Sequence, residues 1–356
     1  MSVARLSCLL GIETPILLGA FGGLSSVELT ATVSELGGLG SYGLYGYDGA
    51  RITQTADALR AATDKPIALN LWLPTGDEVL PGEADLDAAR EATRPIFAEL
   101  GIPLPPLPDR FLPDAQEQLD AVIAARPAVL SLVYGVPSAE LVARAHDAGI
   151  RVVGSATTVA EAVALETAGV DAVIATGFEA AGHRVSFLRP AAESLVGTFA
   201  LVPQVVDAVG VPVIAAGGVA DRRGVAAAIA LGASGVLAGT AFLRTRQSAA
   251  TEAHRQAIIT ATADSSVLTT AMSGRLARGA RNRAVRELEA SGAIAPFPAQ
   301  NWLTGRFRGE AGRLGLGDLL SLWLGQAAPL ARHEDAREVF AELAAGLPTP
   351  IARGGE

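Results

Sequence analysis

Cysteine and histidine are scarce in this sequence. Its 356 residues include one cysteine, Cys8, and four histidines, at positions 146, 183, 254 and 333. A single cysteine excludes a disulfide within the chain and is typical of a reducing compartment, and in the run Leu-Ser-Cys-Leu-Leu we expect it to fill a small space in the core. Because the histidines lack the spacing of a metal site, we predict no bound metal.

Positive charge is also in short supply. Lys and Arg number 28 against 37 Asp and Glu, which gives a formal net charge of −9 and a pI near 5.1. A surface of this sign repels nucleic acid and anionic membranes, so we expect neither as a partner. Glu13 and Pro15 interrupt the N-terminal region, which therefore lacks the continuous apolar core of a signal peptide. These features predict a cytoplasmic protein.

Only one uncharged stretch, residues 224–243, is long enough to be weighed as a membrane span. Four glycines divide it, at positions 224, 232, 235 and 239. Residues 226–231 are typical of a helix, 232–235 of a turn and 236–238 of a buried strand. We therefore predict a helix, a turn and a strand here, and no membrane span.

The chain repeats one pattern: a short apolar strand, a loop, an Ala-rich amphipathic helix and a glycine before the next strand. Hydrophobic residues make up 50% and charged residues 18%, a composition that suits strands covered by helices. The predicted strands lie at residues 15–20, 38–42, 67–71, 128–133, 151–154, 172–175, 213–216 and 235–238. Eight parallel strands with right-handed crossovers predict an α/β fold of the TIM (β/α)₈ barrel type, with an open doubly wound sheet as the alternative.

Two segments do not fit the repeat. Residues 75–114 are rich in proline around a predicted helix at 84–100, and residues 247–356 contain helical stretches, an arginine-rich segment and a closing helix near 335–345. We predict that residues 1–246 form the barrel, and that the insertion 75–114 joins residues 247–356 in a smaller, mainly helical cap at the barrel mouth.

His183 stands at the end of a glycine-containing loop that follows the predicted strand at 172–175. In parallel α/β folds this end of a strand is where ligands meet catalytic groups, and Gly177 and Gly182 allow the backbone to approach a ligand closely. A histidine in such a loop is either a general base or a structural hydrogen-bonding group. His183 is therefore our candidate catalytic residue.

Glycines follow the seventh and eighth predicted strands. Gly217 and Gly218 come after 213–216, and Gly239 with Thr240 after 235–238. In (β/α)₈ barrels these two loops hold a phosphate through exposed N–H groups, and we expect the helix that begins at Asp221 to add the positive end of its dipole. The alternative is that the glycines only form tight turns.

Other polar residues lie at the predicted strand ends. Asn70 can pair with the edge of a flavin or nucleobase or with local backbone, and Thr157 and Thr158 either line the same rim or cap the helix that begins at Val159. Gly274 directly precedes the arginine run 275–283 and Gly279 lies within it, so we expect this segment to form a loop. It holds an anionic ligand or forms ion pairs within the protein or with the acidic face of a second subunit of a homodimer.

The chain resembles the FMN-dependent nitronate monooxygenases over nearly its whole length. The segments that carry the resemblance are 15–23 (PILLGAFGG), 37–40 (GGLG), Asn70, 155–159 (SATTV), 179–184 (EAAGHR), 215–220 (AAGGVA), 239–242 (GTAF), 273–279 (SGRLARG), 296–298 (PFP) and 300–301 (QN). The resemblance implies a barrel enzyme, an oxidoreductase that uses FMN and O₂ to oxidise a small nitronate to a carbonyl compound and nitrite.

The resemblance also implies a set of site residues. His183 is the implied base, and the implied cofactor-binding residues are Asn70, Thr176, Ala181, Gly182, Gly217, Gly218, Leu237, Ala238, Gly239 and Thr240. Family members usually have Met, Gln and Gly where this chain has Phe21, Thr176 and Ala181. Because Thr176 is too short to reproduce a glutamine contact to the flavin, the flavin potential or the choice of substrate is expected to differ. One phosphate site without a Gly-x-Gly-x-x-Gly unit predicts FMN and not FAD.

Two alternatives share these features. An FMN-dependent NAD(P)H:quinone reductase or enoyl-acyl carrier reductase has similar glycine loops and a similar Gly-His loop. A non-catalytic flavin-binding protein would retain the cofactor and react with neither a nitronate nor a reduced nicotinamide.

Overall fold

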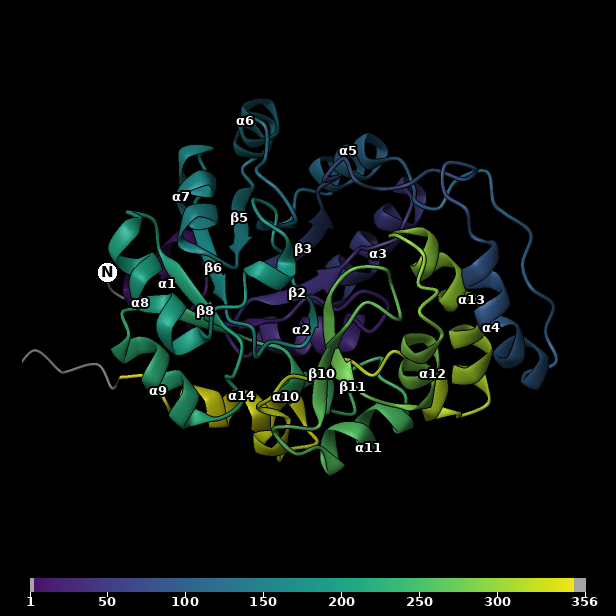
Figure 1. Cartoon of the computed structure of the whole chain (residues 1–356). Helices are drawn as coiled ribbons and strands as arrows, with labels where there is room; N and C mark the ends of the chain where they lie inside the picture. Colours follow the sequence, from purple (N-terminus) through teal and green to yellow (C-terminus); the bar gives the residue numbers. More distant parts are fainter. Residues whose placement is uncertain (1–2, 349–356) are drawn as a thin grey trace, which may run out of the picture.

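The computed structural model describes residues 3–348, so residues 1–2 and the predicted cap residues 349–356 lie outside the described part. Its main sheet has eight parallel strands in the order β1-β9-β8-β6-β5-β4-β3-β2 (Figure 1). These strands are β1 (Ile16–Leu18), β2 (Gly40–Gly43), β3 (Ile67–Trp72), β4 (Val129–Val133), β5 (Arg151–Ala156), β6 (Ala172–Thr176), β8 (Val213–Ala216) and β9 (Gly235–Ala238). A parallel bridge between Leu17 and Leu39 joins the two ends of the order. The sheet is therefore closed, which confirms the predicted barrel and rules out the open sheet.

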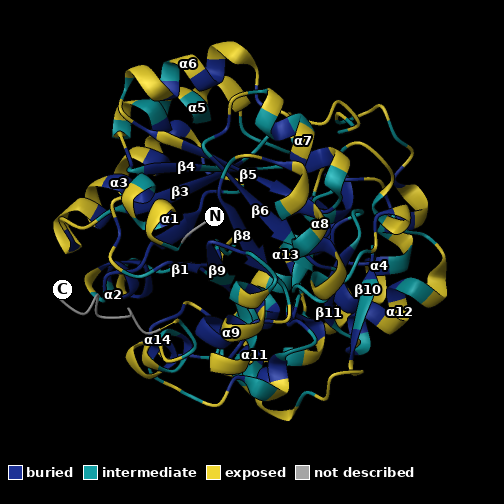
Figure 2. Ribbon diagram, turned by 90° about the vertical axis from the view of Figure 1, so that its left-hand side faces the viewer, coloured by how far each residue is buried: buried dark blue, intermediate teal, exposed yellow. Residues whose placement is uncertain are grey.

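Helices surround the barrel, and their outer faces are exposed whereas the strands are buried (Figure 2). The helices up to the last barrel strand and just after it are α1 (Val3–Leu10), α2 (Val27–Glu35), α3 (Gly49–Ala62), α4 (Asp87–Glu99), α5 (Ala115–Ala125), α6 (Ala139–Asp147), α7 (Val159–Thr167), η1 (Ala191–Glu193), α8 (Thr198–Ala208), α9 (Arg222–Ala230) and α10 (Thr240–Leu243). Side-chain oxygens of Ser26, Asp48, Asp114, Ser138 and Thr158 accept an N–H three residues further on and so fix where five of these helices begin.

Alternate residues of the strands fill the interior of the barrel. One buried cluster contains Leu17, Ala68, Val129, Val153 and Ile214 of the strands, together with Leu6 and Leu10 of the N-terminal helix α1. The residues between them face the surrounding helices and belong to a larger cluster. Because side chains alternate between the two faces of a strand, this pattern fixes which residues point inward all the way to the strand ends.

A second apolar core lies outside the barrel. It joins Ile96 and Phe97 of α4 to residues from the C-terminal third of the chain, including Leu288, Leu303 and Phe307. The elements of that third are α11 (Glu252–Thr260), β10 (Ser266–Thr269), β11 (Ala277–Ala280), α12 (Arg283–Ser291), α13 (Ala299–Arg313), η2 (Gly317–Leu319), η3 (Ala328–Leu330) and α14 (Ala336–Ala344). Figure 1 shows α4, α12 and α13 together on one side of the barrel. We propose that these helices form the cap.

Three sequence predictions need correction. The closing helix α14 packs against α2 and α9 through Val339 and Phe340, so it belongs to the helical layer of the barrel and not to a cap. Residues 277–280 form strand β11 of a small antiparallel sheet, β10-β11-β7, where a loop was expected. Cys8 is exposed, because α1 buries Leu6 and Leu10 on its opposite face.

Residues 224–243 fold as predicted, into most of α9, a turn and strand β9 followed by α10. Among residues 3–348, no helix has the length and apolar character needed to cross a membrane.

Candidate active site

A pocket with a volume of about 250 Å³ opens at the carboxyl ends of the barrel strands. The identity of the residues at its floor follows from the alternation of side chains along the barrel strands. Asn70, Ser131 and Ser155 each stand two residues after an interior apolar residue of β3, β4 or β5, and all three line the pocket. The inward-facing positions thus change from apolar to polar at the strand ends, which is where ligands bind in this fold.

His183 lies in the pocket wall on β7 (Gly182–His183), a strand of two residues after β6. This strand pairs antiparallel with β11, with His183 opposite Ala277 and Gly182 opposite Arg278. Gly182 has a φ of +74°, a conformation that favours glycine. The sequence predicted a loop at this point, whereas pairing with a segment about ninety residues away holds the imidazole in the pocket.

Arg184 holds the segment that carries His183 in place through hydrogen bonds to the backbone. Its guanidinium is 2% exposed and donates to the carbonyl oxygens of Thr176 and Gly177, at 3.2 and 2.7 Å, and to that of Ser194. Burial lowers the pKa of Arg184 to about 10, while Glu161 and Glu179 favour its charged form. The side chain therefore remains a cation at neutral pH and ties the His183 strand to the end of β6.

The surroundings of His183 disfavour its protonated form. Burial, followed by the positive charges of Arg275 and Arg308, lowers the pKa of His183 from 6.5 to about 3. Trp72 and Trp323 flank the ring, with centroid distances of 5.0 and 5.5 Å. At neutral pH the imidazole is neutral and retains a lone pair that can take up a proton.

Ser273 orients the imidazole. Its Oγ lies 2.8 Å from Nε2 of His183, and it also lies 3.1 Å from the carbonyl oxygen of Arg275. The hydroxyl has one proton, so both contacts are satisfied when it donates to the carbonyl and accepts from Nε2–H. That arrangement leaves Nδ1 of His183 as the unprotonated nitrogen.

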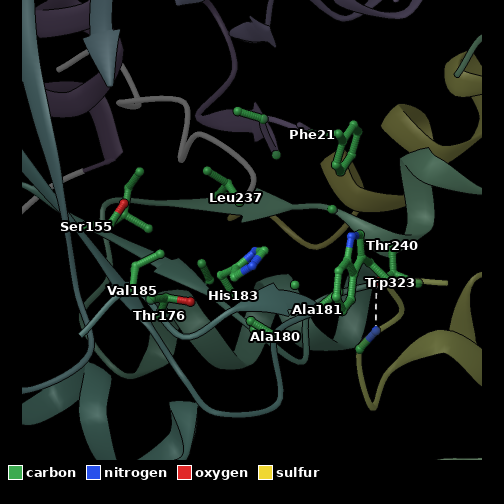
Figure 3. Close-up of a pocket in the computed structure, with 18 of the residues that line it drawn as sticks. Phe21, Ser155, Thr176, Ala180, Ala181, His183, Val185, Leu237, Thr240 and Trp323 are labelled. Carbon is green, nitrogen blue, oxygen red and sulfur yellow. Dashed lines mark hydrogen bonds between the residues drawn. The ribbon is translucent and has the colours of Figure 1, made fainter. Parts of the chain in front are cut away.

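The opposite part of the pocket is built from glycines. Gly217 and Gly218 have φ values of +94° and +75°. Within residues 3–348, no acceptor takes the N–H groups of Gly218 and Gly239. Thr240 begins α10, and its Oγ1 accepts from the N–H of Gly325 at 3.1 Å, the dashed line in Figure 3. Free N–H groups at two adjacent loops form a site that suits a phosphate.

The helix after the first of these loops contributes less than we predicted. The carboxylate of Asp221 already accepts from the N–H groups of Arg223 and Gly224, at 2.9 and 3.3 Å. These donors at the N-terminus of α9 are therefore satisfied by the protein itself, and an anion in the pocket cannot use them.

Two other polar predictions have separate outcomes. Thr157 and Thr158 do not line the pocket; Thr158 caps α7, and Thr157 donates to the buried carboxylate of Glu161. Asn70 does line it, and its Nδ2 donates to Ser131. Since the amide nitrogen is used, the Oδ1 of Asn70 is the atom left to accept a hydrogen bond from a ligand.

The structure brings nearly all the predicted site residues together, around His183 (Figure 3). The pocket is lined by Asn70, Thr176, Ala181, Gly182, His183, Gly217, Gly218, Leu237, Gly239 and Thr240. Ala238 is the exception: it is buried, and its carbonyl accepts from the N–H of Gly19. Their roles in binding and catalysis stay predictions.

Several lining residues were missed in the sequence, among them Trp72, Trp323 and Gly325. Trp72 stands two residues after Asn70 on the same face of β3, so strand alternation was a signal that pointed to it. Trp323 and Gly325 come from the far end of the chain, and no local pattern marks them. A side chain at Gly325 would meet the carbonyl oxygen of Glu179 at 2.8 Å, so only glycine fits this contact between the tail and the His183 loop.

The arginine run forms interactions within the chain. Arg275 pairs with Asp77 and Glu78 of the insertion, Arg281 with Glu289, and Arg283 with Glu99. Arg278 is buried and donates to the carbonyl oxygens of Phe178 and Ser266. Of the alternatives that the sequence left open, ion pairing within the protein is therefore observed.

Comparison with known proteins identifies the family. The nitronate monooxygenase family model matches residues 4–346. A probable nitronate monooxygenase of Staphylococcus aureus (strain Newman) is 37% identical over 341 residues, 95% of this chain and 96% of that protein. The chain belongs to the nitronate monooxygenase family. It is therefore an oxidoreductase of a family that typically depends on flavin and acts on small nitronates.

Solved structures agree with this family. A nitroalkane oxidase from Streptomyces ansochromogenes superposes with a TM-score of 0.84 at 32% identity, over 96% of each chain. FabK from Thermotoga maritima gives a TM-score of 0.74 at 28% identity, over 95% of this chain and 94% of that one. An enoyl reductase domain of MlnA from Bacillus amyloliquefaciens, 13% identical with a TM-score of 0.65, shares the fold.

The departures from the family pattern lie in the pocket of this nitronate monooxygenase homologue. Phe21, Thr176 and Ala181 all line it. The carbonyl oxygen of Thr176 accepts a hydrogen bond from Arg184, which holds this end of β6 in place. A shift of the backbone therefore does not make up for the short side chain of Thr176. The position that a longer side chain would fill is therefore open to a ligand.

We expect the imidazole of His183 to remain neutral between pH 5 and 8. In the unfolded chain His183 takes up a proton below about pH 6.5, whereas in the folded site it does so only near pH 3. The contribution of His183 to the free energy of unfolding therefore falls as the pH drops from about 6.5 to about 3. The measurement is an NMR titration of the histidine ring protons, with the resonance assigned by its loss in His183→Asn. An inflection near pH 6.5 at this resonance would contradict the electrostatic description.

Proposed function

We propose that this protein binds FMN in the barrel pocket and oxidises alkyl nitronates with O₂ to a carbonyl compound and nitrite. The observation that carries the proposal is that His183 and the free N–H groups of Gly218 and Gly239 line the same pocket. One side of the pocket suits the phosphate of FMN, and the other offers a base and a hydrogen-bonding group. The family and the nitroalkane oxidase structure support it.

The residues present fit FMN. The two glycine loops offer donors for one phosphate, and the free Oδ1 of Asn70 offers an acceptor for the N–H edge of a flavin ring. Bound FMN would supply the redox chemistry, which is electron transfer from the electron-rich nitronate and reaction with dioxygen. The protein then has to hold the substrate against the cofactor and exclude water.

His183 has two tasks in this proposal. For a neutral nitroalkane, Nδ1 takes the proton from the carbon next to the nitro group. The resulting imidazolium would be unfavourable in the unliganded pocket, and the negative charge that develops on the nitro oxygens stabilises it. For a preformed nitronate, no proton has to be removed and His183 only helps to bind the anion.

The second candidate is an FMN-dependent reductase that takes hydride from NADH or NADPH. The specific observation in its favour is the likeness to FabK, with a TM-score of 0.74. The two candidates share the barrel and the cofactor pocket, so they differ in the electron donor.

We expect the purified protein to carry FMN. Gly218→Leu should lower FMN retention at least tenfold, because a side chain at a φ of +75° strains the loop and blocks the approach of a phosphate to the backbone. The bound flavin is released and quantified by chromatography. Gly101→Leu is the matched control, since Gly101 has a φ of +67° and nothing within 4 Å of an added Cβ, and it does not line the pocket. FAD, or no flavin after reconstitution, would refute the cofactor assignment.

Anaerobic mixing distinguishes the two enzymes. We expect propionate 3-nitronate and simple alkyl nitronates to bleach the flavin absorbance of the loaded protein rapidly, and NADH and NADPH to leave it unchanged over the same time. Bleaching by a reduced nicotinamide alone would make the protein a reductase. Bleaching by none of the donors would leave a flavin-binding protein without this activity.

Replacement of His183 should affect the two forms of the substrate differently. We expect His183→Asn to lower kcat/KM on the order of 10²-fold with neutral nitroalkanes, the usual scale for a positioned acid or base, and much less with preformed nitronates. Steady-state kinetics are normalised to the flavin content of each variant. Equal losses with both forms would assign His183 to binding alone, and unchanged kinetics would make it structural.

A further inference from the structure

A second cavity of about 220 Å³ lies beside the active-site pocket. Its wall comes from the loop after β2, from the insertion at residues 78–80 and 110–113, and from Phe297. Trp72 lines both this cavity and the pocket that contains His183. Trp72 is therefore the side chain that the two linings have in common.

The aromatic contacts of Trp72 show how it divides the two spaces. On one side its ring lies 5.0 Å from the ring of His183 in an edge arrangement. On the other side it lies 4.3 Å from Tyr45 and 6.0 Å from Phe297, both of which line the second cavity. Trp72 is thus positioned to decide which substituents pass from the active-site pocket into the second cavity.

The polar groups around the second cavity are already satisfied. Glu78 pairs with Arg275 at 2.9 Å, and Arg275 also lies over the ring of Phe297 at 3.9 Å. The hydroxyl of Tyr45 accepts from Asn301 at 2.9 Å. Arg110 is exposed at the rim, where water solvates its charge. An anion gains little inside this cavity, because the unpaired charge in its described lining, that of Arg110, is exposed to water.

Much of the lining of the second cavity is hydrocarbon. Leu44, Leu71, Leu73, Val79 and Leu112 line it. Leu80, also in the lining, is 60% exposed, so the apolar lining extends to the surface of the protein. Such a wall stabilises an alkyl chain by removing it from water and offers nothing specific to a polar group.

We propose that the second cavity holds the hydrocarbon substituent of the nitronate, with the nitronate group beside His183 and the carbon chain passing the edge of Trp72. This inference rests on the proposed function and names its substrate class: nitronates of linear alkanes of several carbons in preference to the shortest ones. Trp72 is then a residue that determines specificity, and the insertion that carries Leu80 and Leu112 is the element that provides it.

A chain-length series tests the proposal. With the FMN-loaded enzyme and the nitronates of nitroethane, 1-nitrobutane and 1-nitrohexane, we expect kcat/KM to rise about fourfold for each buried methylene, mostly through KM, since the chain contact is present before and during the reaction. Leu112→Trp fills the cavity and should lower kcat/KM for the hexyl nitronate tenfold or more, while the ethyl nitronate changes less than twofold. Leu107→Trp is the matched control, because Leu107 lies in the same insertion, is 50% exposed and does not line the cavity.

A binding measurement separates the cavity from the chemistry. Calorimetric titration with 1-hexanol, which has the chain and no nitro group, should give binding in the wild type and in Leu107→Trp, and none in Leu112→Trp. If Leu112→Trp does not fold, Leu80→Trp at the exposed rim blocks the same opening. Oxidation of the nitronates without dependence on chain length, and equal behaviour of the filled and control variants, would overturn this inference. Binding of 1-hexanol with no oxidation of any nitronate would refute the proposed function and leave the cavity assignment standing.

Discussion

The active site depends on the pairing of two short backbone segments. Gly182 and His183 pair with Ala277 and Arg278, and these two segments are separated in the sequence by the barrel strands β8 and β9, helices α8 to α11 and strand β10. This pairing turns the loop after β6 into a fixed wall and sets Ser273 next to the imidazole. Without it, His183 would stand on a glycine loop, and neither its hydrogen bond nor its position in the pocket with the glycine loops would be defined.

Buried arginines determine the electrostatics of this wall. The protein as a whole is acidic, yet Arg184 and Arg278 are buried and Arg308 is half-buried near the pocket, and each donates to oxygen atoms of the backbone or of uncharged side chains. Burial, followed by the positive charges of Arg275 and Arg308, disfavours a proton on His183, and these two charges favour a negative charge beside it. The same field that weakens the histidine as a base in the unliganded pocket attracts an anionic substrate.

The barrel and the C-terminal segment supply different residues of the candidate site. The barrel supplies the glycine loops and the polar strand ends, whose positions follow from the closed sheet. The C-terminal segment supplies Ser273 and Trp323, and together with the insertion it forms the second cavity. Arg275 links the two parts through its ion pairs with Asp77 and Glu78. The glycine loops therefore come from the regular fold, whereas Ser273 and Trp323 beside His183 come from its additions.

The sequence by itself determined the eight strands and their closure, the glycine loops and the choice of His183, because alternation of apolar residues and the conformational freedom of glycine are local properties. The resemblance to a family added the implied cofactor-binding residues, of which Ala238 alone does not line the pocket. Only the tertiary structure decided that Cys8 is exposed, that Asp221 satisfies its own helix, that the arginines pair internally, and that Trp72, Ser273 and Trp323 surround the imidazole. These outcomes depend on which distant segments meet, and the pairing of β7 with β11 has no signature in either segment alone.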